Sequence, residues 1–166
     1  MFFGIENVIK QSKVGNTRKR WDFQVNYNNE IINIEFDGAQ HYCDINIIIS
    51  DKEKNLYAKS LNQKVIRIPY WIQLDKLMFK YYFGFEFDIE TDYKHGFIDK
   101  KATLPASFCE IGVDRFLSEL YQLPELIFSN VMDSLIDKIE LYPNELFVIP
   151  KKIIDELSGN NSSIFR

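Results

Sequence analysis

Hydrophobic and polar residues alternate along two neighbouring stretches near the start of the chain. In the first stretch, Trp21, Phe23 and Val25 fall on one side, and Asp22 and Gln24 fall on the other. The second stretch repeats the alternation with Ile32, Ile34, Glu35, Phe36 and Asp37. Successive side chains of a β-strand point to opposite faces of the sheet. The pattern therefore predicts two strands, over residues 21–26 and 31–36, joined by a polar hairpin turn at residues 26–30.

The same reasoning predicts the elements around this hairpin. A short helix over residues 2–10 precedes it, and a connecting loop over residues 42–49 follows it. Ser50-Asp51 then begins a helix over residues 51–62, which uses Leu56, Tyr57 and Leu61 to cover the sheet. The apolar run Lys64–Pro69 predicts a buried strand, and the helix before it makes a crossover that places this strand parallel to its predecessor.

Beyond residue 70 the pattern becomes mostly helical. Helices are predicted over residues 71–83, 107–120 and 124–142, with an acidic, aromatic segment at 85–93 and a loop at 94–107. A short strand over residues 145–149 and a helix over 150–157 end the structured part. The prediction is an α/β (α+β) fold whose mixed sheet is flanked by helices. It divides into a core over residues 1–72, a mostly helical region over 73–158 and a flexible tail over 159–166.

Composition limits the class of protein and its compartment. The chain has 166 residues, of which 46% are hydrophobic and 15% aromatic, and this excludes general disorder. No apolar run approaches the ~20 residues of a membrane-spanning helix, and the N-terminus lacks the pattern of a secretory signal. Cys43 and Cys109 have no metal-binding spacing, so free thiols in a reducing compartment are expected. We therefore expect a cytoplasmic protein without a membrane partner.

The distribution of charge is more informative than the net charge of −4. The first 70 residues carry ten basic and eight acidic side chains, whereas the remainder carry ten and sixteen. Arg18, Lys19 and Arg20 come directly before the first strand, and Lys52 and Lys54 follow the second. Such local cations can bind the phosphates of DNA even when the whole chain is acidic. The alternative interpretation is a solvated, charged loop and helix.

Acidic residues gather on the predicted hairpin. If the polar sides of both strands face the same way, Asp22, Glu35 and Asp37 converge on one face, with Gln40 and His41 just beyond the strand end. Carboxylates and an imidazole on strands that are otherwise rich in Ile and Phe are costly unless a cation holds them. The hairpin therefore predicts a cation site.

Several segments together resemble the PD-(D/E)XK nuclease superfamily. They are Asp22-Phe23, the run IEFDGAQHY over residues 34–42, Asp51 with Lys54 three positions later, and the run VIRIP from Val65. They are most similar to the branch that contains the very-short-patch-repair (Vsr) mismatch endonucleases and homing endonucleases described by an E-D-x-H-D set of residues. The resemblance covers about residues 1–72. It implies a restriction-endonuclease-like fold and DNA hydrolysis with Mg²⁺, for which Mn²⁺ would substitute.

The resemblance also implies metal ligands. Asp22 is similar to the metal-binding aspartate on the family's first strand, and either Asp37 or Glu35 takes the second acidic position. The sequence departs from the superfamily in one respect, because the lysine expected two residues after Glu35 is replaced by Asp37. Which of these two carboxylates is the second ligand stays open.

Catalytic roles follow by the same comparison. His41 matches the histidine that handles the attacking water, and Asp51 matches the helix aspartate that supports it. An imidazole exchanges protons near neutral pH, which suits this role. Glu6 is placed against the family's N-terminal glutamate by order along the chain alone. Lys54, or the basic loop over residues 18–20, would offset charge on the scissile phosphate.

The function expected from these residues is a magnesium-dependent DNA endonuclease. Cutting both strands with a single site per chain calls for a homodimer or for successive nicks, and both stay open. Two other classes of function are consistent with the sequence. One is a catalytically inactive nuclease-fold module that binds DNA or a protein partner, and the other is a structural subunit whose helical half docks onto another protein.

Overall fold

A four-stranded sheet forms the centre of the fold in the computed structural model, which describes residues 3–85 and 108–141. The strands are β1 (Val8–Lys13), β2 (Arg20–Tyr27), β3 (Glu30–Asp37) and β4 (Lys64–Pro69), in that order across the sheet. Strand β2 pairs antiparallel with both β1 and β3, and β4 pairs with β3 in parallel. The chain is therefore a mixed α/β protein, and the predicted parallel strand after a helical crossover is confirmed.

The hairpin between β2 and β3 is also confirmed. Its loop is Asn28-Asn29, and both residues have positive φ values, 51° and 63°. Two successive left-handed residues match the right-handed twist of the flanking strands, and asparagine tolerates this conformation better than most residues. The turn fixes the register in which Val25 pairs with Ile32.

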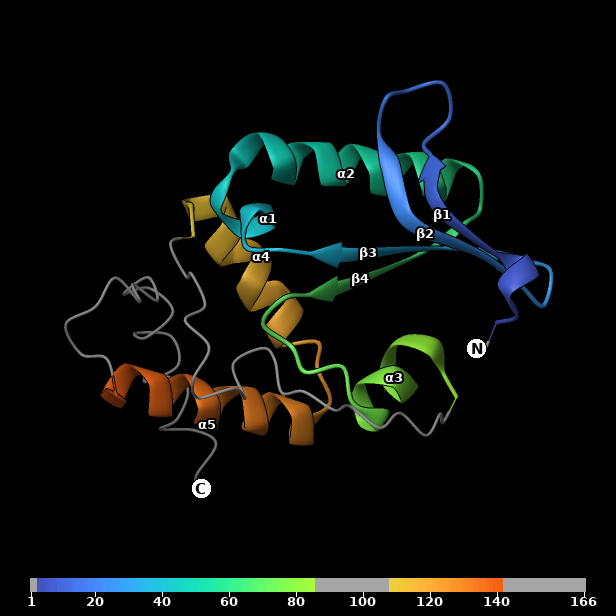
Figure 1. Ribbon diagram of the computed structural model, residues 1–166. Coiled ribbons are helices and arrows are strands. Elements are labelled where there is room, and N and C mark those ends of the chain that lie inside the picture. The colour runs from blue at the N-terminus through green and yellow to red at the C-terminus, as the bar shows by residue number, and fades with distance from the viewer. Residues whose placement is uncertain (1–2, 86–107, 142–166) are drawn as a thin grey trace.

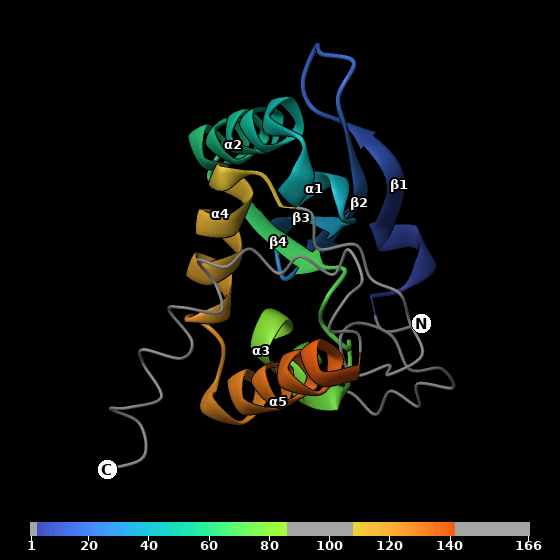
Figure 2. The ribbon, with the colours of Figure 1, turned by 90° about the vertical axis from the view of Figure 1, so that its left-hand side faces the viewer.

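Helices lie on both faces of the sheet (Figure 1). Helix α2 (Ile45–Ser60) covers one face, and α3 (Lys76–Phe83) and α5 (Glu125–Leu141) lie on the other. The short helix α1 (Gln40–Cys43) follows β3 directly. Helix α4 (Glu110–Leu120) contacts both α1 and α2 and passes beside the β4 side of the sheet (Figure 2). The end of β3 is thus surrounded by α1, α2 and α4.

The predicted helix over residues 2–10 is wrong. A single 3₁₀ turn, η1 (Ile5–Asn7), is followed by strand β1, which pairs antiparallel with β2 from Val8 to Lys13. The apolar spacing of so short a segment is compatible with either element, and the unpaired edge of β2 decides in favour of a strand.

The predicted loop over residues 42–49 is also wrong. Helix α1 occupies its start, and α2 begins at Ile45, six residues before the predicted start at residue 51. The cap is Asp44, whose carboxylate accepts a hydrogen bond of 2.8 Å from the Asn46 amide. A helix N-terminus leaves amide donors unpaired, and an aspartate just before it satisfies one of them.

The side of α2 that covers the sheet differs from the predicted side. Leu56, Tyr57 and Leu61 are exposed, Leu56 to 67%. The buried side consists instead of Ile48, Asp51, Lys54 and Ala58. Half of these side chains are charged, so the hydrophobic periodicity that usually identifies a buried helix face is absent.

Two groups of apolar side chains form the main cores. The sheet core contains Val25, Ile32, Ile34, Ile66 and Ile68, against which Leu74, Tyr82 and Phe83 pack. The helical core joins α4 and α5 to Tyr42 of α1 and to Trp71 and Ile72 after β4. Residues on both sides of the predicted boundary at position 72 thus share one core.

The remaining predicted helices begin later than the pattern suggests. Helix α3 starts at Lys76 rather than near Trp71, because the Asp75 carboxylate caps it at the Met78 amide, 2.9 Å away. The helices predicted over 107–120 and 124–142 are confirmed as α4 and α5. Predictions for residues 86–107 and 142–166 lie outside the described residues. None of the helices formed by residues 3–85 and 108–141 has the length and apolar character that a membrane crossing requires.

Candidate active site

Two acidic side chains on β3 face helix α2. Glu35 and Asp37 lie two residues apart on the strand and therefore on the same face, and both are buried, Asp37 completely. Asp51 and Lys54 lie three residues apart on α2, hence on one face of the helix, and both are buried. The predicted acidic strand face and the predicted Asp51/Lys54 helix face thus meet inside the protein.

Asp37, His41 and Asp51 form the first of two polar groups in this layer. His41 Nδ1 lies 2.6 Å from Asp51 Oδ2 and 3.4 Å from Asp37 Oδ1. Each of the three residues offers a ligand atom within 4.8 Å of the others. His41 reaches this position because α1 starts directly after the Gly38 turn, one helical turn beyond the end of β3.

Arg67 of β4 lies beside both aspartates. Its Nη1 donates hydrogen bonds to Asp37 Oδ1 and Oδ2, at 2.7 and 2.9 Å. Its Nη2 lies 3.1 Å from Asp51 Oδ1 but makes no hydrogen bond with a described residue. Parallel pairing of β3 with β4 places Arg67 opposite Glu35, one strand away from the group.

Arg115 enters the same group from α4. Its Nη2 donates a short hydrogen bond to Asp37, and its Nη1 donates to Asp51 Oδ2 at 2.8 Å and to the His41 carbonyl at 3.1 Å. Its Nε donates to Glu119 Oε1 at 2.8 Å, and its guanidinium lies 4.8 Å from the ring centre of Tyr42. The Tyr42 hydroxyl in turn donates to Glu119. Each guanidinium nitrogen of Arg115 therefore has a hydrogen-bond partner, and the group bridges the two aspartates.

Glu35 and Lys54 form the second polar group. The Lys54 ammonium donates a short hydrogen bond to Glu35 and a bond of 2.7 Å to the carbonyl of Arg20. It also lies 4.6 Å from the ring centre of Trp21. The predicted catalytic lysine is thus a buried partner of Glu35 in this structure.

Asp22 lies at the point where β2 separates from β3. Pairing of the two strands extends only to Phe23, and Asp22 Oδ2 accepts a hydrogen bond of 2.9 Å from the Phe36 amide beyond it. Trp21 consequently packs with Val14 and Ala58, on the α2 side, rather than with Val25. The expectation that Trp21 shares a face with Val25 is wrong, because the separation of the strands interrupts the alternation.

Comparison of the chain with protein-family models, with curated proteins and with solved structures gave no match. The family resemblance therefore stays a prediction from the motif.

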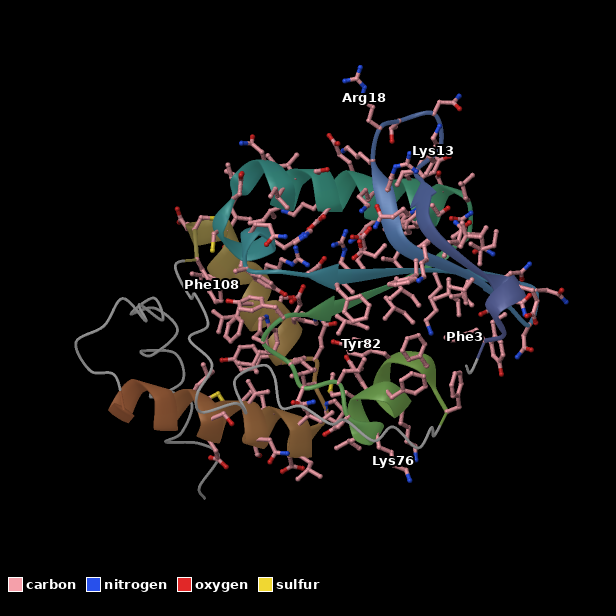
Figure 3. The ribbon with its side chains drawn as sticks, in the orientation of Figure 1. Phe3, Lys13, Arg18, Lys76, Tyr82 and Phe108 are labelled. Atoms are coloured by element: carbon pink, nitrogen blue, oxygen red, sulfur yellow. The ribbon has the colours of Figure 1, made fainter. Side chains whose placement is uncertain are left out.

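The other predicted site residues lie apart from the group formed by Asp37, His41 and Asp51. Glu6, in η1, lies just before β1, whose first residue Val8 pairs with Val25 at the opposite end of the sheet from Asp37. Arg18 is at the tip of the loop between β1 and β2 and projects away from the sheet (Figure 3). Lys19 pairs with Glu53, and Arg20 Nη1 donates to the Gln11 carbonyl at 2.8 Å.

Lys52 has a closer relationship to the group. It lines a cavity of about 560 Å³ between α2 and α4, together with Asp51, Arg67 and Arg115. Asp114 and Glu119 lie in the same cavity wall. Asp51 and both arginines therefore border this cavity, whereas Asp37 is fully buried, and Lys52 is the predicted DNA-binding residue that lines it.

Burial and ion pairing act in opposite directions on the carboxyl groups. Burial alone would raise the pKa of Asp51, but the hydrogen bond from His41 and the charge of Arg67 outweigh it, so the pKa is lowered. For Glu35, burial dominates over the attraction of Lys54, and the pKa is raised. Burial likewise raises the pKa of Glu119. The three carboxyl groups thus differ in their affinity for a proton within a small volume.

Sequence reasoning missed Arg67, Arg115 and Glu119. Arg67 has a sequence signal, because it is a charged residue inside the otherwise apolar run Lys64–Pro69. Such a side chain in a buried strand needs a buried partner. Arg115 and Glu119 have no such sequence signal, since a charged pair four residues apart on an amphipathic helix is typical of a solvated surface.

Proposed function

We propose that this chain is a magnesium-dependent DNA endonuclease that hydrolyses phosphodiester bonds. The observation that carries the proposal is the arrangement of His41, Asp51 and Asp37 at the end of β3. An imidazole held at Nδ1 by a carboxylate, next to a second buried carboxylate, is suited to general-base chemistry beside a cation. The proposal also includes a restriction-endonuclease-like fold. The mixed sheet and the helices beside it are compatible with that fold.

The donor atoms fit a hard divalent cation. Asp37, Asp51 and His41 offer ligand atoms within 4.8 Å of one another, and Mg²⁺ or Mn²⁺ favours carboxylate oxygens with several waters. When bound, such an ion would neutralise charge on the phosphate and lower the pKa of water. Asp22 and Glu35 are the alternative pair, because burial raises the pKa of Glu35 and the nearby negative charge of Asp22 acts in the same direction.

His41 would act as the general base in this reaction. Its Nδ1 faces Asp51, and the tautomer in which Nδ1 donates to this carboxylate leaves Nε2 with the lone pair that can accept a proton from water. Asp51 would stabilise the imidazolium that forms. Arg67 and Arg115 would offset the charge that develops on the phosphate oxygens.

DNA would approach through the cavity between α2 and α4. Lys52 at this cavity and Arg18 on the loop between β1 and β2 supply positive charge for phosphate contacts. The same proposal places the protein in the cytoplasm, or wherever the DNA that it cleaves is located. Homodimerisation would allow cleavage of both strands.

Cleavage of supercoiled plasmid DNA tests the proposal directly. The wild-type chain should convert the plasmid to nicked or linear product with Mg²⁺ or Mn²⁺ and leave it intact with EDTA. His41→Ala should lower this rate by about 100-fold or more, the usual contribution of a general base. His95→Ala is the matched control, because His95 is the other histidine of the chain. Undiminished cleavage by His41→Ala would exclude the assigned role.

A catalytically inactive module is the alternative, and one observation favours it. Both aspartates of the group are already paired with Arg67 and Arg115, and Glu35 is paired with Lys54. Ion pairs of this kind can hold a fold together without chemistry. Binding of DNA that is independent of metal, with no cleavage of duplex, nicked or single-stranded substrates, would support this alternative.

A further inference from the structure

Arg115 lies where a cation shared by Asp37 and Asp51 would lie. Its two terminal nitrogens each donate to one of the two carboxylates, so the guanidinium bridges them. Asp37 is fully buried and Asp51 nearly so. Buried carboxylates need a positive partner, and in this structure helix α4 supplies it.

Each of the two aspartates has arginine partners without a metal ion. Asp37 and Asp51 contribute two negative charges, Arg67 and Arg115 contribute two positive charges, all within direct contact, and Glu119 is a further acidic group paired with Arg115 Nε. A divalent cation added between the two aspartates would place two further positive charges beside two arginines in a buried site. Repulsion at such distances is strong where water screens it weakly. Metal binding therefore requires an arginine to move, an anion to enter, or both.

A cavity with basic side chains in its wall adjoins this group. The cavity between α2 and α4 is lined by Lys52, Arg67 and Arg115, together with Asp51, Asp114 and Glu119. Arg67 Nη2 is buried and lies 3.1 Å from Asp51 Oδ1, but it makes no hydrogen bond with a described residue. Buried donors in folded proteins are nearly always hydrogen-bonded, so this nitrogen keeps the capacity to donate to an acceptor that enters the group.

We propose that Arg115 is an exchangeable counter-ion of the Asp37–Asp51 pair, so that a divalent metal ion and a phosphodiester bind here cooperatively. Asp37 and Asp51 would hold the metal ion through carboxylate oxygens that now accept hydrogen bonds from Arg115. The released Arg115 guanidinium, together with Arg67, would then bind the phosphate. The inference rests on the metal site of the proposed function, and it adds a role for α4, which lies outside the resembling segment.

Metal binding measured without catalysis tests this inference. The probes are Mn²⁺, followed by electron paramagnetic resonance, and a thymidine dinucleotide with one phosphodiester. Saturating dinucleotide should raise the Mn²⁺ affinity of the wild-type chain by about 10-fold or more, and saturating Mn²⁺ should raise the dinucleotide affinity by the same factor. The methylphosphonate dinucleotide, which carries no charge, should leave the Mn²⁺ affinity unchanged. Equal coupling by the charged and uncharged dinucleotides would overturn the inference.

Arg115→Gln removes the positive charge of the proposed counter-ion. With the resident charge removed, Mn²⁺ alone should bind about 10-fold tighter than to wild type, and coupling to the dinucleotide should fall below about 3-fold. Lys13→Gln removes an exposed cation at the end of β1 and is the matched control for net charge. Mn²⁺ binding to Arg115→Gln that is no tighter than to wild type would contradict the exchange.

Two further variants locate the metal. Asp51→Asn should weaken Mn²⁺ binding, whereas Asp22→Asn should leave it within about 3-fold of wild type. The reverse result would place the ion at Asp22 and Glu35 and overturn the inference. Product formation is followed in the same samples. Coupling between Mn²⁺ and the dinucleotide without any cleavage would support the inference and contradict the proposed endonuclease. Cleavage without such coupling would support the endonuclease and overturn the inference. If Arg115→Gln does not fold, the coupling in wild type remains a sufficient test.

Discussion

The His41 ring nitrogen Nδ1 lies 2.6 Å from Asp51 Oδ2, within a charge-assisted hydrogen bond. The contact joins α1, which directly follows β3, to the first half of α2. It sets the tautomer and orientation of an imidazole beside the buried Asp37 carboxylate. The consequence for catalysis can be measured with one substitution.

Asp51→Asn should slow DNA cleavage at saturating Mg²⁺ by about 10²–10⁴-fold. The amide cannot stabilise the imidazolium, and its NH₂ group would favour the wrong tautomer of His41. Single-turnover cleavage of a labelled duplex measures the effect, with plasmid nicking as a second assay. A variant that keeps the wild-type rate would show that the contact between His41 and Asp51 is structural.

Acid stability should depend on the same aspartate. Its folded-state pKa lies below the ordinary value, because the hydrogen bond from His41 and the charge of Arg67 outweigh the effect of burial. As pH falls, the unfolded chain therefore takes up this proton first, near pH ~3.9. The contribution of the ionised carboxylate to stability is complete above that pH and is lost as pH falls through the lower, folded-state pKa.

Comparison of wild type with Asp51→Asn measures this contribution. The difference between their free energies of unfolding should be largest near neutral pH and should shrink below about pH 4. Urea denaturation at a series of pH values gives both curves. A difference that stays constant down to the lowest pH would contradict the lowered pKa.

The buried pair of Lys54 and Glu35 makes a separate prediction about stability. Lys54→Met leaves the Glu35 carboxylate buried without its partner and should cost about 3 kcal/mol. Burial already raises the pKa of Glu35 against the attraction of Lys54, and loss of the lysine should raise it further. Urea denaturation of the variant at neutral pH checks the cost.

The double variant Lys54→Met with Glu35→Leu tests whether the pair itself stabilises the fold. Replacing both charges by apolar groups should restore stability to within about 1 kcal/mol of wild type. The same proteins should be assayed for cleavage. A stable double variant that cleaves DNA at the wild-type rate would exclude Glu35 as a required metal ligand.

Local patterns predicted the part of the fold that depends on neighbours in sequence. The hairpin follows from alternation on two strands and from a turn that asparagine accommodates at Asn28 and Asn29. The parallel strand follows from an apolar run after a helix. For helix α2, both the predicted start and the predicted buried face were wrong, because Asp51 and Lys54 occupy positions that apolar residues usually fill. Asp51 and Lys54, which interrupt the apolar pattern of the helix, are the residues that the family motif predicted as site residues.

The part of the candidate site that sequence could not predict comes from distant segments. Asp37, His41 and Asp51 lie within 15 positions of one another and follow one motif. Arg115 reaches them from 64 positions beyond Asp51. Only the packing of α4 against α1 and α2 brings its guanidinium between the aspartates, and packing of this kind has no local signature. The metal ligands remain a prediction.

Gly112 controls that packing and gives the last prediction. A Cβ atom added at Gly112 would lie 1.7 Å from the Tyr42 carbonyl oxygen, a backbone atom that cannot rotate away. Alanine favours a helix over glycine by about 1 kcal/mol, whereas forcing extra atoms into a packed contact costs about 1–3 kcal/mol. Because relief requires α4 to move away from α1, the steric cost should dominate, and Gly112→Ala should lower stability by about 1–2 kcal/mol.

The displacement should also reach Arg115, one helical turn further along α4. Its contacts with Asp37, Asp51 and the His41 carbonyl depend on the position of the helix, so Gly112→Ala should change Mn²⁺ affinity through that position. Ser118→Ala, an exposed position on the same helix, is the control and should change stability by no more than about 0.5 kcal/mol. Thermal unfolding and Mn²⁺ titration of both variants supply the measurements. If Gly112→Ala were as stable as wild type with an unchanged Mn²⁺ affinity, α4 could not be the element that holds the counter-ion in place.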